Sequence, residues 1–210
     1  MAYYYNTVHN NSQCDYNIAF LDDNITATLT RSSFAVTQWI SLIEHIHRCR
    51  LHKLVVGFDI EWRPNRRGVI NPVAILQLCV GRRCLIFQIF HSDGIPHSLY
   101  SFLNNRNYTF VGVGIREDVN KLYQDYELWV ACTMDLRNLA AEKLDMKDLN
   151  RAGLKRLAMV VLDTEVEKPR HITMSNWNGL YLTDAQVHYA CLDAFLSFEI
   201  GRTLIRTNSR

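Results

Sequence analysis

The chain has 210 residues, of which 48% are hydrophobic and 21% are charged, and its net charge is +2 at pH 7. This composition is typical of a globular protein with one sizeable core. No apolar run approaches the ~20 residues needed to span a bilayer, so we expect no membrane partner. The small net charge neither indicates nor excludes a nucleic-acid-binding surface, because local patches decide such binding.

Six cysteines are scattered through the chain, and no two of them form a C-x-x-C motif. We therefore predict reduced, mostly buried thiols of an intracellular protein in the cytoplasm or the nucleus. The first residues, MAYYYNTVHNN, have no basic segment followed by an apolar one, so we expect no secretory signal. We predict a flexible N-terminus over residues 1–15 and a single domain over residues 16–210.

The first half of the chain is predicted to be rich in strands. Residues 16–23 and 25–31 are typical of two strands joined by a tight turn. Residues 33–50 carry apolar side chains at helical spacing, which predicts a helix. Further strands are expected at residues 55–62, 73–81 and 83–89, the last two joined by a turn at Gly81-Arg82.

Helices dominate the second half. A helix around Pro96–Asn104 precedes a strand at residues 108–115. Further helices are expected near residues 116–126, 136–144, 153–161 and 183–204. The last of these begins with Thr183 and Gln186 at the spacing of a capping box. Strands first, and then strands alternating with helices, indicate an α/β fold with a mixed β-sheet flanked by α-helices.

The strand VVGFDIEW, residues 55–62, carries two carboxylates in an otherwise apolar run. Side chains alternate along a strand, so Asp59 and Glu61 lie on the same face. Two like charges side by side destabilise a strand, and burying an unpaired carboxylate is costly. A bound cation is the simplest compensation for the two charges.

Two further acids stand in unusual settings. Asp118 follows an apolar strand at the start of a predicted helix, and Asp193 lies in an apolar helix four residues after Tyr189, on the same helix face. Each acid alone also fits a structural role, at a sheet edge, at a helix N-terminus or in an ion pair. Together, four carboxylates supply the oxygen ligands that two Mg²⁺ or Mn²⁺ ions need for phosphoryl displacement.

These motifs resemble those of the DEDD superfamily of 3′–5′ exonucleases on the ribonuclease H-like fold, in the branch with a tyrosine in the third motif (DEDDy). FDIEW with VAILQLCVG resembles the first motif, FVGVGIREDVNKL the second and LTDAQVHYACLDAF the third. The likeness covers roughly residues 55–205 and is greatest to Werner-type exonucleases and to small plant exoribonucleases linked to RNA silencing. Cys191 stands where the family often has Ala, which affects packing rather than chemistry.

The resemblance implies a role for each of these residues. Asp59 would bridge both metal ions, and Glu61 would bind the ion that holds the attacking water. Asp118 would bind the second ion, and Asp193 would complete the first site. Tyr189 would orient the water and help to activate it. The implied reaction is hydrolysis of the terminal phosphodiester at the 3′ end of a single strand, with release of a nucleoside 5′-monophosphate.

The loop after the acidic strand supplies candidate substrate-binding residues. Arg63, Arg66 and Arg67 suit phosphates through bidentate geometry, and a solvated surface loop is the alternative. The ring of Trp62 is a candidate for stacking on a terminal base, with core packing as the alternative. The resemblance also implies that Trp177 supports the active site structurally.

The motifs leave the substrate open between RNA and DNA, because a metal clamp contacts the phosphate and not the sugar. The likeness to small plant exoribonucleases favours RNA and implies a hexameric homo-oligomer with RNA-silencing proteins as partners. The likeness to Werner-type exonucleases makes DNA the rival substrate. A non-catalytic module that binds nucleic acid or a protein partner is a further alternative, and the intact acids and tyrosine argue against it.

Overall fold

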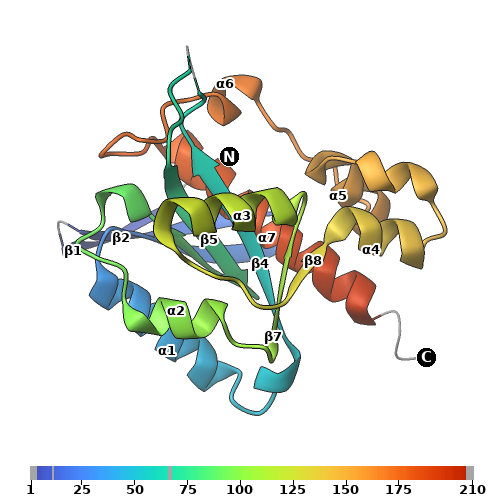
Figure 1. The fold of residues 1–210 in the computed structure, drawn as a ribbon, viewed down its shortest axis with the longest axis horizontal. Coiled ribbons are helices and arrows are strands. Elements are labelled where there is room, and N and C mark those ends of the chain that lie inside the picture. The colour runs from blue at the N-terminus through green and yellow to red at the C-terminus, as the bar shows by residue number, and fades with distance from the viewer. Residues whose placement is uncertain (1–3, 11, 66–67, 207–210) are drawn as a thin grey trace.

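The computed structural model describes residues 4–10, 12–65 and 68–206 (Figure 1). These residues form one eight-stranded sheet with the order β1-β2-β3-β6-β5-β4-β7-β8. The strands are β1 (Tyr4–Asn10), β2 (Gln13–Phe20), β3 (Asp23–Thr30), β4 (Leu54–Trp62), β5 (Val73–Val80), β6 (Arg83–Phe87), β7 (Tyr108–Gly112) and β8 (Thr133–Asp135). The helices are α1 (Ser33–Ile46), α2 (His97–Leu103), α3 (Ile115–Tyr126), α4 (Leu136–Lys143), α5 (Leu154–Leu162), α6 (Arg170–Thr173) and α7 (Asp184–Arg206), and the 3-10 helices are η1 (Leu51–Lys53), η2 (Ile89–His91) and η3 (Lys147–Arg151).

The sheet is mixed, as predicted. Strands β1, β2 and β3 pair antiparallel, and so do β4, β5 and β6. The pairs β3–β6, β4–β7 and β7–β8 are parallel. Gly81 has a φ of 59°, a left-handed conformation that suits glycine in the tight β5–β6 turn. Helices lie on both sides of this sheet (Figure 1), which confirms the predicted α/β class.

Strand β4 has two different faces. Val56, Phe58 and Ile60 point into the core and are buried. On this side the ring of Phe110 makes edge-to-face contacts with Phe58, at 6.5 Å between centroids, and with Phe102 of α2, at 5.9 Å. Helix α2 therefore covers the apolar face of β4, and the alternating side chains point to the opposite face.

Helix α7 covers that opposite face, and Gly57 permits its close approach. A Cβ atom at position 57 would lie 2.0 Å from the carbonyl oxygen of Ala194 and 2.7 Å from the backbone nitrogen of Phe198. Side chains two residues apart on a strand share a face, so Gly57 and Asp59 both face α7. The backbone contact at Gly57 thus brings α7 onto the acidic face of β4.

The parallel pairing of β4 with β7 brings the ends of both strands to one edge of the sheet. Gly57 is opposite Val111, so the residues that follow each strand lie near each other. Helix α3 begins directly after β7, with Gly114 as its N-cap at a φ of 74°. Asp118 lies in the first turn of α3 and is therefore delivered to the edge at which β4 presents its carboxylates.

The β5–β6 hairpin corrects one expectation from the sequence. Cys79 and Cys84 are cross-strand partners with Cα atoms 4.2 Å apart, and their sulfurs form a disulfide. The prediction that all cysteines are reduced is therefore wrong for this pair. The cause is the turn at Gly81, which folds two residues separated by five positions onto each other. The free cysteines of the described residues are Cys14, Cys49, Cys132 and Cys191.

Two strands were not expected from the sequence. Strand β1 lies inside the segment 1–15, for which the sequence predicts a flexible N-terminus, and it pairs with β2. The mobility of this segment stays a prediction. Strand β8 has only three residues and extends the sheet beyond β7. No helix of the described residues is long and apolar enough to span a membrane.

Candidate active site

Three of the four predicted carboxylates converge. Asp59 and Glu61 of β4 and Asp193 of α7 each offer a carboxylate oxygen, and these oxygens all lie within 4.8 Å of one another. Asp118, in the first turn of α3, is close enough to act electrostatically on Asp59 and Glu61 but does not belong to this group. We call the first three residues the carboxylate cluster, with Asp118 at its margin.

Repulsion and burial make these acids hard to ionise. Burial, followed by the charges of Asp193 and Asp118, raises the pKa of Asp59 well above its usual range. Burial and the neighbouring charge of Asp59 do the same to Glu61. Burial raises the pKa of Asp193, and burial with the adjacent charge of Glu117 raises that of Asp118 to about 7. The site therefore holds more negative charge than it can stabilise alone.

Lys168 supplies a positive charge that sequence reasoning missed. Its Nζ donates to the Oδ2 of Asp193 over 2.6 Å and lies 4.9 Å from the centre of the Tyr189 ring. Burial lowers the pKa of Lys168, but the charges of Asp193 and Asp59 outweigh burial and raise it. Lys168 lies in the irregular segment before α6, so it follows no periodic pattern that would have marked it in the sequence.

Tyr189 lies beside the cluster, one helical turn before Asp193. Its hydroxyl oxygen accepts a hydrogen bond of 3.0 Å from the Oγ1 of Thr173, and the hydroxyl lies close enough to Asp193 for a hydrogen bond that acts against the rise in the pKa of that carboxyl. Burial and the charge of Asp193 raise the pKa of Tyr189 above its usual value. The tyrosine is therefore a neutral hydrogen-bond donor at physiological pH.

The predicted capping box attaches the preceding loop to α7. The backbone N–H of Thr183 donates to the Oε1 of Gln186 over 3.0 Å, and the N–H of Gln186 donates to the Oγ1 of Thr183 over 3.3 Å. The Nε2 of Gln186 also donates to the Oγ of Ser175 over 2.9 Å. Trp177 is buried in this loop, its Nε1 donates to the carbonyl of Thr173, and its ring lies 5.9 Å from that of Tyr189. The loop thus fixes the surroundings of the tyrosine.

The donor set fits a hard divalent cation. Mg²⁺ and Mn²⁺ prefer carboxylate oxygens, and a single ammonium group cannot balance three clustered carboxylates. The fully buried side chain of Gln77 is opposite Asp59 in the β4–β5 register, and neither its Nε2 nor its Oε1 has a hydrogen-bond partner in the described residues. Cross-strand partners share a face of the sheet, so an unsatisfied amide lies beside the cluster. Both observations indicate that part of the site comes from outside the chain.

The structure describes two of the four candidate substrate-binding residues, Arg63 and Trp62. Arg63 is exposed, and its backbone N–H donates to the Oδ1 of Asn178 over 3.4 Å. Arg66 and Arg67 lie outside the described residues. Trp62 is half-buried and packs against the core, and the Nζ of Lys121 lies 5.3 Å from the centre of its ring. That ring therefore already has a cation as a neighbour, and its stacking on a base stays a prediction.

Comparison with known proteins identifies the family. The model of the 3′-5′ exonuclease family matches residues 31–206. A 3′-5′ exonuclease of Arabidopsis thaliana is 38% identical over 152 residues, which cover 71% of this chain and 52% of that protein. The bifunctional 3′-5′ exonuclease/ATP-dependent helicase WRN of Mus musculus is 36% identical over 71% of this chain and 11% of that protein. The chain thus spans about half the length of the Arabidopsis relative and a smaller part of WRN.

Solved structures agree with this match. The Nibbler EXO domain of Aedes aegypti shares the fold with a TM-score of 0.68 at 18% identity, covering 90% of this chain and 91% of that one. The EXD2 exonuclease domain soaked in Mn and GMP has a TM-score of 0.50 at 29% identity and covers 86% and 90%. The family match extends over most of the chain and includes the elements that carry all the clustered acids. This chain therefore belongs to the 3′-5′ exonuclease family.

Proposed function

We propose that the chain is a metal-dependent 3′–5′ exonuclease of the DEDDy type. It hydrolyses the terminal phosphodiester of a single-stranded nucleic acid, with RNA favoured, and releases a nucleoside 5′-monophosphate. The observation that carries this proposal is the meeting of Asp59, Glu61 and Asp193 within 4.8 Å, on two elements far apart in the sequence. The neighbouring Tyr189 and the family match support it.

The carboxylates would hold two Mg²⁺ or Mn²⁺ ions. Asp59, Glu61 and Asp193 are the ligands of the carboxylate cluster, and Asp118 at its margin serves the second ion. When bound, such ions polarise the scissile phosphate and lower the pKa of the attacking water. The raised pKa values of the acids fit this assignment, because charges that repel one another in the metal-free chain are those that cations stabilise.

Tyr189 would orient the attacking water. Its raised pKa keeps the phenol protonated, so it donates a hydrogen bond to the water oxygen rather than removing a proton as a phenolate. The hydrogen bond that Thr173 donates fixes the position of the hydroxyl. Tyr189 would thereby turn a lone pair of the water towards the phosphorus.

Lys168 would keep the carboxylate cluster in its ionised form. Its ammonium group holds Asp193 at 2.6 Å, and its raised pKa ensures that it stays charged. An ionised Asp193 is a better ligand than a protonated one, because metals bind the deprotonated carboxylate. The lysine therefore prepares the site for its ions.

The substrate strand would follow the loop that carries the arginines. Arg63 is exposed next to β4, and with Arg66 and Arg67 it would contact backbone phosphates, while Trp62 would stack on a terminal base. The EXD2 exonuclease domain was studied with GMP and with dGMP, which supports a nucleoside monophosphate product and keeps DNA as the rival substrate. RNA preference, a hexameric assembly and RNA-silencing partners rest on the sequence resemblance.

Degradation of matched RNA and DNA strands tests this function. Each strand carries a 5′ label and is incubated with Mg²⁺, with Mn²⁺ or with EDTA. We expect a ladder that shortens from the 3′ end with either ion, faster on RNA, and no products in EDTA. Equal rates on both strands would overturn the RNA preference alone. Undiminished cleavage in EDTA would contradict the metal-dependent mechanism.

A further inference from the structure

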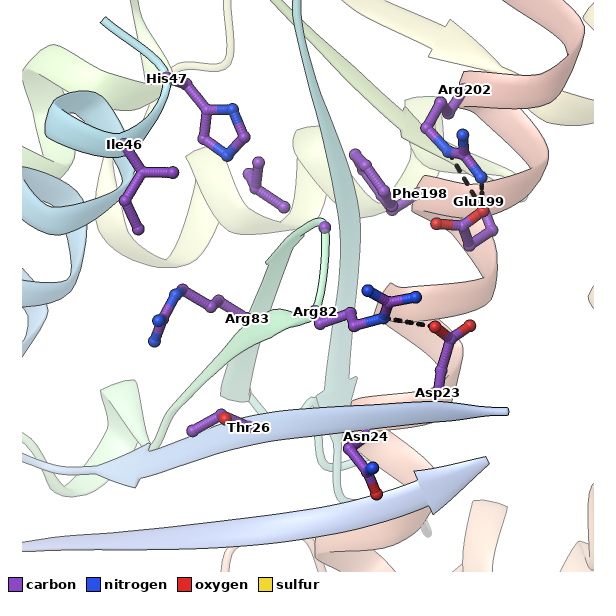
Figure 2. A pocket seen from close by; sticks show the side chains of 12 residues that line it. Asp23, Asn24, Thr26, Ile46, His47, Arg82, Arg83, Phe198, Glu199 and Arg202 are labelled. Carbon is purple, nitrogen blue, oxygen red and sulfur yellow. Dashed lines mark hydrogen bonds and ion pairs between the residues drawn. The ribbon is translucent and has the colours of Figure 1, made fainter. Parts of the chain in front are cut away.

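A polar hollow lies at the opposite end of β4 from the carboxylate cluster. It has a volume of about 570 Å³ and is formed by the β5–β6 turn, the start of β3, the end of α1 and the second half of α7 (Figure 2). Its lining includes Arg82, Arg83 and Arg202, together with His47 and Phe198. No residue of the carboxylate cluster contributes to it.

An adjoining hollow of about 480 Å³ continues this surface around the end of the sheet. The two share His47, Val80, Phe198 and Arg202 in their linings, so they adjoin each other on the surface. The second hollow adds the cationic side chains of Arg50, Lys53 and Arg206. We call the combined lining the basic trough.

The basic trough concentrates positive charge. It contains six arginines and lysines against two carboxylates, an excess of four positive charges on a chain whose total is +2. Burial and the charge of Arg50 lower the pKa of His47. The excess of positive charge is therefore counted with this histidine neutral. Charge of one sign gathered in a concave surface raises the local concentration of oppositely charged ligands.

Both carboxylates of the trough are already engaged. Asp23 pairs with Arg82, and Glu199 pairs with Arg202, and Figure 2 shows both pairs. Arg83 extends between α1 and β3 without such a partner. In the described part of the chain, the remaining cations Arg50, Lys53, Arg83 and Arg206 have no ion pair with a carboxylate. These four are therefore available to an anion from outside.

The distance between the carboxylate cluster and the basic trough indicates how long a strand must be to reach both. Asp193 and Arg202 are both on α7, nine residues apart, which is ~13 Å along the helix axis and about half a turn around it. A stacked strand advances ~3.4 Å per nucleotide, so at least about four nucleotides are needed to span this gap around α7. A strand whose 3′ end occupies the carboxylate cluster is thus long enough, after a few nucleotides, to place phosphates in the trough.

We propose that the basic trough is a second nucleic-acid-binding site, which holds backbone phosphates of the substrate strand on the 5′ side of the 3′-terminal nucleotides. This inference rests on the proposed function of the carboxylate cluster. The trough takes no part in hydrolysis, and it contacts phosphates and no base edges, so its contribution is to affinity and not to sequence preference. Substrates too short to reach it are held by the active site alone.

The test neutralises three exposed cations of the trough in one variant, Arg50→Gln, Lys53→Gln and Arg83→Gln. A control variant carries the same change of charge on an exposed surface elsewhere, Lys147→Gln, Arg151→Gln and Lys155→Gln. KM and kcat are measured for single strands from two to about 20 nucleotides. Binding of the same 5′-labelled strands is measured by fluorescence anisotropy without divalent ions, so the trough is tested even if cleavage fails.

Losing three phosphate contacts should raise KM and Kd for the longest strand roughly 10- to 100-fold near 0.1 M salt, and lower the slope of log Kd against log salt by about 2. Strands of up to about four nucleotides should be unaffected, kcat should not change, and the control variant should resemble the wild type. Equal weakening at every length, no weakening, or the same loss in the control would overturn the proposal. So would a saturable site for inorganic phosphate that the trough variant loses without any dependence on strand length.

Discussion

Asp59→Asn should stabilise the metal-free protein while removing its affinity for metal. The substitution keeps the shape of the side chain and removes one of three charges that lie within 4.8 Å of one another. At an effective dielectric constant of ~20, two such charges repel by about 3 kcal/mol, so the repulsion of Asp59 by Glu61 and Asp193 together is about 6 kcal/mol. The attraction between Asp59 and Lys168, together with the protons that the raised pKa values retain in the cluster, offsets most of this repulsion. We therefore expect a net gain of about 2 kcal/mol, which raises Tm by about 4–8 °C for a domain of this size.

The stability that Asp59→Asn gains over the wild type should increase as the pH rises. The carboxyl pKa values of the cluster are raised in the folded state, and that of Asp118 is about 7 against an ordinary value of 3.8. Below the ordinary carboxyl pKa these acids are protonated in both the folded and the unfolded state, so they do not reduce the free energy of unfolding. As pH rises above it, the unfolded chain loses protons that the folded chain retains, so wild-type stability falls until the folded pKa values are passed. Asp59→Asn should match the wild type near pH 4 and exceed it at pH 8.

Thermal unfolding followed by circular dichroism measures this difference in EDTA and in Mn²⁺. Mn²⁺ at about 100 times its Kd should stabilise the wild type by about 2.7 kcal/mol and the variant much less, so the order of the two Tm values reverses. Glu142→Gln removes an exposed carboxylate on α4 and serves as the control. A variant that is less stable than the wild type in EDTA at pH 8, or that gains as much from Mn²⁺, would refute the reasoning.

The remaining predictions address the tyrosine, the glycine and the ions. Tyr189→Phe should fold and bind Mn²⁺ normally but slow single-turnover cleavage by ~10²–10⁴-fold, and a wild-type rate would disprove its role at the water. Gly57→Ala forces a Cβ to 2.0 Å from the backbone of Ala194, so it should cost about 3 kcal/mol or more in chemical unfolding and abolish cleavage. Gly153→Ala, where a Cβ meets nothing within 4 Å, should be tolerated, and equal losses would contradict the α7 packing argument. Mg²⁺ or Mn²⁺ should restore activity after EDTA while Ca²⁺ binds without turnover, and cleavage with Ca²⁺ alone would count against this coordination.

Local periodicity explains why most of the carboxylate cluster could be predicted. The alternation of a strand places Asp59 and Glu61 on one face, and the helical repeat places Tyr189 one turn before Asp193. The meeting of β4 with α7 is a tertiary contact that no local pattern encodes, and the family motifs supplied it. The structure then refines the set, because Asp118 lies at the margin of the cluster.

Features without a local pattern were missed. Lys168 acts through a contact with Asp193, 25 residues away, from a segment that has neither helical nor strand periodicity. The amide of Gln77 is polar in a fully buried strand, and its position beside Asp59 follows only from the β4–β5 register. The basic trough combines residues of β3, the β5–β6 turn, α1, η1 and α7, and the small net charge of the whole chain concealed it.

The most direct test of the central claim is single-turnover cleavage of one 5′-labelled RNA strand with a free or a blocked 3′ end. The wild type in Mn²⁺ should shorten the free strand from its 3′ end and leave the blocked strand intact, and the released product should be a nucleoside 5′-monophosphate. Asp59→Asn should leave both strands intact under the same conditions, because it loses a ligand of the carboxylate cluster. Products that shorten from the 5′ end, or normal cleavage by Asp59→Asn, would contradict the account.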